Sequence, residues 1–200
     1  MTIVWLHGWP LDERMWEQQV SRFGGNAVRL YGRGSSIDGW AEQILREVEG
    51  ELFLVGASMG GYTALAIVRQ APERVPALVL VGSPAGADSP ERKAFRNELI
   101  PRLRAEGSPE NAAQSVSVEE LVAAQEAMRD RGDSTDVVHA FAGPMVVCAG
   151  AEDEILTPDE ARALAAAAPN GRAVVFEGAG HFMSLERPDE FDAVIAEVLA

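Results

Sequence analysis

The sequence of 200 residues is short of several residue types, and each shortage excludes a class of protein. It contains one cysteine, Cys148, so it cannot form an intramolecular disulfide. No apolar run approaches the length of a bilayer-spanning helix, and the first residues, "MTIVWLHGWP", lack the basic segment of a secretory signal. The sequence therefore predicts a cytoplasmic protein that does not enter a membrane, with Cys148 as a thiol inside a buried strand.

Basic residues are also scarce. Lysine and arginine together number 17 against 31 acidic residues, which gives a net charge of −14. No window holds the dense basic run that would neutralise phosphates, so we expect no nucleic-acid partner. The acidic balance favours neutral or cationic ligands weakly, through long-range repulsion of anions.

Metal-binding patterns are missing as well. The three histidines, His7, His139 and His181, lie far apart in the sequence, and neither CxxC nor HExxH occurs. We therefore expect no metal site.

What the chain does contain is a repeated pattern of short apolar runs, each closed by glycine and most followed by helical spacing. Such runs are typical of βα units in a parallel sheet, and their continuous apolar character predicts strands buried on both faces. The six runs are "TIVWLHG", "NAVRLYG", "ELFLVGA", "ALVLVG", "PMVVCAG" and "AVVFEGAG". The expected helices are 15–23, 37–48, 59–70, 158–168 and 188–199.

One connection is too long for a simple crossover. The segment from Ser83 to Gly143 holds two helical patterns, "SPERKAFRNELIPRLRAE" and "SVEELVAAQEAMRDR", separated by the breaker-rich "GSPENAAQS". We interpret it as a small helical cap inserted at about 84–143 into a single domain of residues 1–200. The alternative is a pair of flanking helices that cover no site.

The stretch "FLVGASMGGYTAL" places Ser58 at a predicted junction of strand and helix. A serine on such a tight turn exposes its hydroxyl above the carboxyl edge of the sheet, and glycines at 56 and 60 remove side chains that would collide with the bend. The N–H of Met59, at the start of the helix, is free to bind an oxyanion. The alternative is an ordinary turn with a serine that caps a helix.

A serine nucleophile needs a base and an acid, and both follow later strands. Asp153 lies in "GAEDEILTP" after the fifth apolar run, and His181 lies in "GAGHFMSLERP" after the sixth. Their order after Ser58 is the order that this strand-end arrangement demands. Glu152 and Glu154 remain open as alternatives for the acid.

Two further residues belong to the loop "HGWP" after the first run. We expect His7 to hold this loop by hydrogen bonding, and the N–H of Trp9 to complete an oxyanion hole with that of Met59. His139, in "DVVHAF", is expected on a helix face at or near the cap.

With these residues in place, the chain resembles the α/β-hydrolase superfamily, and within it small bacterial carboxylesterases, enol-lactonases and cofactor-free haloperoxidases that share "GxSMGG". The resemblance covers almost the whole chain, through "LHGWPLD", "GASMGGYTALAIVRQAPERVPALVLVGS", "GAEDEILTP" and "GAGHFMSLERPDEF". It implies an α/β fold, a three-layer sandwich around a mainly parallel six-stranded sheet with a short helical cap.

Three features depart from the family pattern. The chain begins directly at "TIVWLHG", without the antiparallel strands that usually precede it, so we expect six parallel strands. Leu30 stands near the position where the family commonly has an aspartate. The cap is short, which predicts an open or shallow pocket and small or partly protruding esters.

The resemblance implies a serine hydrolase that cleaves small to medium carboxylic esters through an acyl-enzyme, without metal or organic cofactor. Ser58 would be the nucleophile, His181 the base and Asp153 its orienting acid. A lactonase or perhydrolase with the same three residues, and a non-catalytic ligand-binding protein on this fold, remain as alternatives. The expected partner is a small-molecule ester, and the sequence does not define an oligomeric state.

Apolar residues near these loops are candidates for the walls of a substrate pocket. Trp9, Phe182 and Met183 are the candidates for substrate binding, although each could equally be part of the core.

Overall fold

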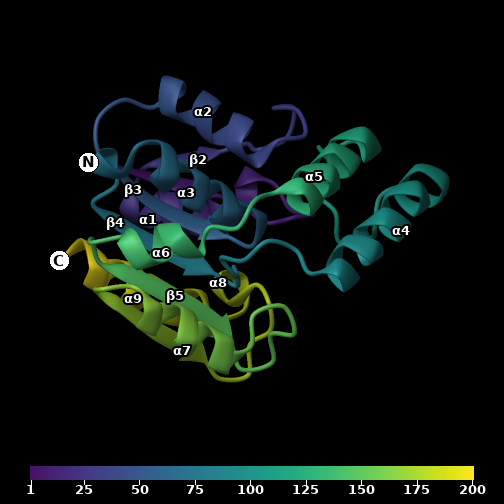
Figure 1. Ribbon diagram of the computed structural model, residues 1–200. Helices are drawn as coiled ribbons and strands as arrows, with labels where there is room; N and C mark the ends of the chain where they lie inside the picture. The colour runs from purple at the N-terminus through teal and green to yellow at the C-terminus, as the bar shows by residue number, and fades with distance from the viewer.

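A six-stranded parallel sheet forms the centre of the computed structural model, which describes all 200 residues (Figure 1). In sheet order the strands are β2 (Asn26–Val28), β1 (Thr2–Leu6), β3 (Leu52–Ala57), β4 (Ala77–Val81), β5 (Met145–Gly150) and β6 (Gly171–Phe176). Every neighbouring pair is parallel, which confirms the expected sheet. The carboxyl ends of all six strands therefore meet at one edge, where ligands bind in open α/β sheets.

Burial along the sheet follows strand position. Strands β3, β4 and β5 are buried at every residue, as the apolar runs predicted. The prediction of burial on both faces is wrong for β2 and β6, which keep several partly exposed residues. Both lie at the edges of the sheet, where a strand has one neighbour and the helices cover it incompletely.

Helices cover both faces of the sheet and form two separate cores. The larger core lies against α2 (Ile37–Glu47), α3 (Met59–Gln70), α6 (Thr135–Ala140) and α7 (Pro158–Ala167). The smaller lies against α1 (Glu17–Phe23), α8 (Met183–Glu186) and α9 (Pro188–Leu199). Short 3-10 turns, η1 (Glu13–Trp16) and η2 (Pro72–Arg74), complete the layers, and the three-layer arrangement is confirmed.

The starts of the helices follow the polar residues that cap them. Thr157 and Glu160 form a capping box at the start of α7. Ser36 accepts a hydrogen bond from the N–H of Gly39 at the start of α2. The helices expected over 59–70 and 188–199 have those bounds, and those expected from 37 and 158 end one residue early. The helix expected over 15–23 is divided into the turn η1 and the helix α1.

Three helices occupy the long connection between β4 and β5. Two of them, α4 (Pro90–Glu106) and α5 (Val118–Asp130), lie side by side and project beyond the carboxyl edge of the sheet (Figure 1). The third, α6, instead packs against α3 and α7. We call the segment from Asp88 to Arg131, which contains α4 and α5, the cap hairpin.

Cys148 lies in β5 and is fully buried, as the sequence predicted. Burial raises the pKa of its thiol to about 12, because a thiolate is poorly solvated in the core. No helix of the protein is both long enough and apolar enough to cross a membrane.

Candidate active site

Ser58 occupies a strained turn between β3 and α3. It has φ 50° and ψ −110°, and it is the one residue other than glycine with a positive φ. This backbone conformation is sterically strained for every residue except glycine. Non-glycine residues adopt it mainly at functional sites. The Ser58 N–H donates to the carbonyl of Val81 at 2.8 Å, which anchors the turn to β4.

The neighbouring glycines are required by close packing. A Cβ at Gly56 would collide with the carbonyl of Gly60 in the first turn of α3. A Cβ at Gly60 would collide with the carbonyl of Leu6 at the end of β1. Because both positions are glycine, the turn can be sharp and pack closely against β1 and α3. A serine on such a sharp turn exposes its hydroxyl above the edge of the sheet.

His181 and Asp153 form a pair at the same edge. The Nδ1 atom of His181 lies 3.0 Å from each carboxylate oxygen of Asp153. Asp153 Oδ1 also accepts hydrogen bonds from the N–H groups of Ile155 and Leu156, at 2.8 and 3.3 Å. These contacts fix a carboxylate whose side chain is fully buried.

The pairing determines the protonation pattern of the imidazole. An ionised carboxylate only accepts hydrogen bonds, so His181 Nδ1 donates and Nε2 of the neutral ring keeps its lone pair. His181 Nε2 is buried and has no hydrogen-bond partner, and it does not bond the Ser58 hydroxyl in this structure. Such contacts are often long before a substrate binds.

The alternatives for the acid are placed differently. Glu152 and Glu154 flank Asp153 but both are exposed to solvent. Of the three acidic side chains, Asp153 is the one that contacts His181.

Two backbone N–H groups near Ser58 in the fold have no acceptor within the protein. Met59 is the first residue of α3, so its N–H has no acceptor earlier in the helix. The N–H of Trp9, in the loop after β1, donates to no group of the protein. Both residues are the oxyanion donors predicted from the sequence, and that role stays a prediction.

His7 holds the loop that carries Trp9. Its Nε2 accepts the N–H of Leu30 at 3.0 Å, and its Nδ1 lies 3.2 Å from the carbonyl of Gly8. Desolvation by burial lowers the pKa of His7 to about 4, so the ring is neutral at pH 7. Leu30 stands near the position where the family commonly has aspartate, and it binds His7 through its backbone N–H.

A cavity of about 300 Å³ lies between this edge and the cap hairpin. The body of the protein lines it with Trp9, Pro10, Ser58, Tyr62, Ile155, His181 and Phe182. The cap hairpin lines it with Arg92, Phe95, Arg96, Leu99, Asn111, Gln125 and Met128. Trp9 and Phe182 therefore lie where the sequence analysis expected pocket walls.

Other predicted residues lie elsewhere. Met183 is fully buried in the core beside α9 and does not line the cavity, because the first turn of α8 points it into the molecule. His139 is exposed on α6, away from the cap hairpin. No three His, Cys, Asp or Glu side chains come together as a metal site would require.

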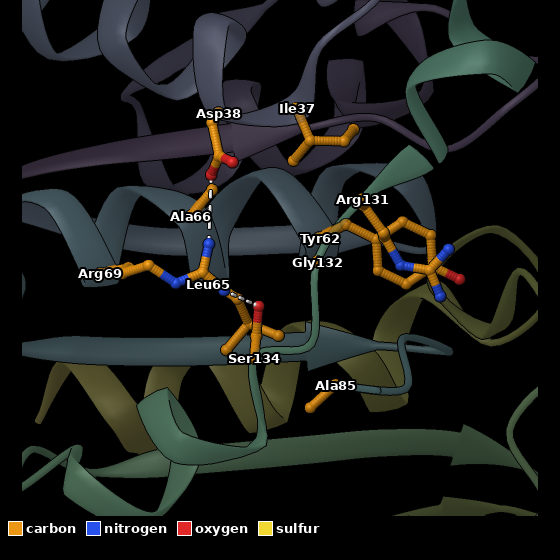
Figure 2. A pocket seen from close by; sticks show the side chains of 10 residues that line it. All are labelled: Ile37, Asp38, Tyr62, Leu65, Ala66, Arg69, Ala85, Arg131, Gly132 and Ser134. Atoms are coloured by element: carbon orange, nitrogen blue, oxygen red, sulfur yellow. Dashed lines mark hydrogen bonds and ion pairs between the residues drawn. The ribbon is translucent and has the colours of Figure 1, made fainter. Parts of the chain in front are cut away.

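The cap hairpin is joined to the body through Arg131. Its guanidinium lies 3.8 Å from the centre of the Tyr62 ring, a cation–π contact that can be followed in Figure 2. The hollow drawn there, between Arg69, Tyr62 and Ser134, has a volume of about 10 Å³, close to that of one water molecule. It is too small to bind a substrate.

A larger hollow, of about 500 Å³, lies between the end of α3 and α6. It is lined by Val75, Pro76 and Phe141 among others, and by no serine, cysteine or histidine. This larger hollow therefore lacks the serine and histidine that line the cavity at the carboxyl edge.

Sequence reasoning missed the polar residues of the cap hairpin. Arg92 and Arg96 are four residues apart and share a helix face, which a pattern search could have found. Gln125 carried no comparable signal, because its place in the cavity depends on packing between α4 and α5.

The protein is similar to named esterases. A pimeloyl-[acyl-carrier protein] methyl ester esterase from Nitrosomonas europaea is 37% identical over 92 residues, which are 40% of this chain and 36% of that protein. The match thus spans little more than a third of that relative. The enzyme of the same name from Cronobacter sakazakii is 28% identical over 236 residues, covering 97% of this chain and 91% of its own.

A solved structure is also similar over the whole chain. A thermophilic esterase from Thermogutta terrifontis, with malate bound, has a TM-score of 0.88 and 28% identity, covering 100% of this chain and 89% of that one. The model of the alpha/beta hydrolase family matches residues 3–194. With its six parallel strands and the serine turn between β3 and α3, the chain belongs to the alpha/beta hydrolase family.

Proposed function

We propose that the protein is a carboxylesterase that cleaves small esters through a covalent acyl-enzyme on Ser58. One observation carries the proposal: the His181 ring is held by buried Asp153 at Nδ1, while its buried Nε2 is unpartnered beside the cavity of Ser58. A base with a fixed tautomer and a free lone pair next to a serine is what nucleophilic catalysis requires. The named esterases among similar proteins support the same reaction class.

The reaction would begin when His181 Nε2 takes the proton from Ser58 as its oxygen attacks the ester carbonyl. Asp153 stabilises the imidazolium that forms and keeps the ring in place. His181 then returns the proton to the departing alcohol, and water hydrolyses the acyl-enzyme by the same exchange.

The negative charge that develops on the carbonyl oxygen needs donors fixed in advance. The N–H groups of Met59 and Trp9 supply them in this proposal, because neither has an acceptor within the protein. The hydrogen bond from Leu30 to His7 keeps the Trp9 loop in position.

The size of the cavity limits the substrate. Its volume of about 300 Å³ is at the lower end of the range for small-molecule sites. Trp9, Phe95 and Phe182 provide apolar walls against a short acyl or alkyl chain. We therefore expect short esters to react faster than long ones.

The test is hydrolysis of p-nitrophenyl acetate, butyrate and octanoate, together with a simple lactone, by the wild type, Ser58→Ala and Ser184→Ala. Ser184 is a buried serine of α8 outside the cavity, so its variant controls for loss of a hydroxyl. We expect Ser58→Ala to lose at least about a thousandfold in kcat/KM for every ester, and Ser184→Ala to retain activity. Full activity of Ser58→Ala would overturn the proposal.

A further inference from the structure

The cap hairpin presents an unusually cationic and donor-rich surface to the cavity. Arg92 and Arg96 both line it from one face of α4, and Asn111 and Gln125 line it from the rest of the hairpin. No acidic side chain lines the cavity, although the chain has 31 acidic residues. The local charge at the site is therefore opposite in sign to that of the whole molecule.

Arg96 is committed to a structural role. Its guanidinium pairs with Asp88, a carboxylate that Arg131 also binds, and all three side chains are almost fully buried. Burial alone would raise the pKa of Asp88, but the bonds from both arginines hold that pKa below its usual value. Asp88 therefore stays ionised and keeps Arg96 in place.

The fixed Arg96 in turn determines which way the amide of Gln125 points. Arg96 Nη1 donates to Gln125 Oε1 at 2.6 Å. Because a guanidinium only donates, the amide oxygen must face Arg96, which leaves the Nε2 group on the other side. Gln125 is 1% exposed and lines the cavity, and no group of the protein accepts a hydrogen bond from its Nε2.

Arg92 differs from Arg96 in having no partner. Its guanidinium makes no ion pair and no hydrogen bond with the protein, and its backbone N–H donates to the Ser89 hydroxyl at the start of α4. Its side chain is half-buried and lines the cavity from the same face of α4 as Arg96. The Arg92 guanidinium and the Gln125 Nε2 group line the same small cavity and lack an acceptor, so a ligand that supplies acceptors gains hydrogen bonds to both.

We propose that the preferred substrate is an ester that carries a carboxylate at its other end, accepted by Arg92 and by Gln125 Nε2 while Ser58 attacks the ester carbonyl. This inference rests on the proposed function and adds the substrate class. An anionic substrate is the opposite of what the net charge of the chain weakly favours. The contacts within the cavity decide, because salt screens distant acidic residues beyond about 8 Å, whereas Arg92 and Gln125 would touch the substrate.

The test compares two substrates of the same shape, monomethyl glutarate and the neutral methyl ester in which an isopropyl group replaces the carboxylate. The readout is the ratio of their kcat/KM values for the wild type, Arg92→Gln and Gln125→Glu. Gln125→Glu keeps an oxygen for Arg96 but replaces the cavity donor with a negative charge. We expect the wild type to favour the anionic ester, and each variant to lower the ratio by about 10- to 100-fold, the effect of losing a hydrogen bond to a charged group.

Lys93→Gln is the matched control. Lys93 is the neighbour of Arg92 on α4, carries the same charge, and does not line the cavity, so we expect the wild-type ratio. A wild type that does not favour the anionic ester, or a ratio that falls equally in Lys93→Gln and Arg92→Gln, would overturn the inference while leaving the esterase proposal intact. If the wild type hydrolyses neither ester nor p-nitrophenyl acetate, the proposed function itself fails, and the inference with it.

Discussion

Gly82, the residue after β4, leaves the space that the His181 ring fills. A Cβ built at this position would lie 2.8 Å from His181 Cε1 and 3.1 Å from Asp153 Oδ2. Its φ of +59° also belongs to the left-handed region, where glycine is favoured. The proposed base thus depends on a position that has no side chain.

We predict that Gly82→Ala lowers both ester turnover and stability. The methyl group should displace His181 and lower ester turnover by about 100-fold, a typical effect of a 1 Å misplacement. The strained backbone should cost about 1–2 kcal/mol in the free energy of unfolding. The measurement is kcat/KM together with urea denaturation.

Gly50→Ala provides the control for backbone strain. Gly50 has φ +76° and no atom within 4 Å of a Cβ, so the substitution adds strain without contact. Its loss of stability should be similar and its activity unchanged. Equal activity in the two variants would contradict the role given to Gly82.

His7 makes the stability of the loop that carries Trp9 depend on pH. Burial lowers its pKa from 6.5 to about 4, so below pH 6.5 the unfolded chain binds a proton that the folded protein excludes. Stability from this group is therefore complete above pH 6.5 and is lost as the pH falls towards 4. At pH 5 the loss is about 2 kcal/mol.

We predict that His7→Leu is less stable than the wild type at pH 7, by about 1–3 kcal/mol, because the N–H of Leu30 loses its acceptor. At pH 5 this difference should shrink by about 2 kcal/mol, since the variant has no histidine to desolvate. Urea denaturation at the two pH values measures both. A stability difference between variant and wild type that is the same at pH 5 and pH 7 would show that His7 does not cause the pH dependence.

For individual residues, the sequence was sufficient to predict positions that depend on local spacing. Ser58, Asp153 and His181 each follow an apolar strand, so their convergence at one edge could be expected from the order of the runs alone. The orientation of Gln125 could not, because it follows from a contact with Arg96 across 29 residues and two helices.

Among the structural elements, the cap hairpin is held at both ends by one buried carboxylate. Asp88 precedes α4 and Arg131 follows α5, and the pair between them closes the base of the hairpin. The second pair, to Arg96, attaches the middle of α4 to the same point. Removal of Asp88 would leave two buried cations without a counter-ion.

We predict that Asp88→Asn destabilises the protein by about 3 kcal/mol and loosens the cap hairpin more than the sheet. Hydrogen exchange should accelerate in residues 90–130 before it does so in β3 and β4. Asp130→Asn is the control, because the Asp130 pair with Arg129 leaves 60% of the Asp130 side chain exposed and contributes little. Uniform exchange across the hairpin and the sheet in Asp88→Asn would contradict this account.

Predictions of elements succeeded where capping and periodicity agree. The helices over 59–70 and 188–199 have the expected bounds; Pro72 follows the end of the first, and Pro188 begins the second. The burial of β2 and β6 was overestimated because an apolar run does not reveal which strands lie at the edges of the sheet. The division of the long insertion into a projecting hairpin and a packed α6 depends on contacts with α3 and α7, which periodicity does not describe.

For the molecule as a whole, the parallel sheet determines where an active site can form. All strands end at one edge, and Ser58, Asp153 and His181 each follow a strand that ends there. The cap hairpin closes that edge into a small cavity. The parallel sheet and the family could be predicted from the sequence, whereas the polar lining of the cavity depends on how the cap hairpin packs.

The central claim is that Ser58 is the nucleophile, and labelling with a fluorophosphonate tests it most directly. The probe forms a stable covalent bond with a serine only when that serine is activated by a base. The account predicts one label per chain, found on the peptide that contains Ser58 and absent from Ser58→Ala. A folded wild type that takes no label, or takes it on another residue, would contradict the account.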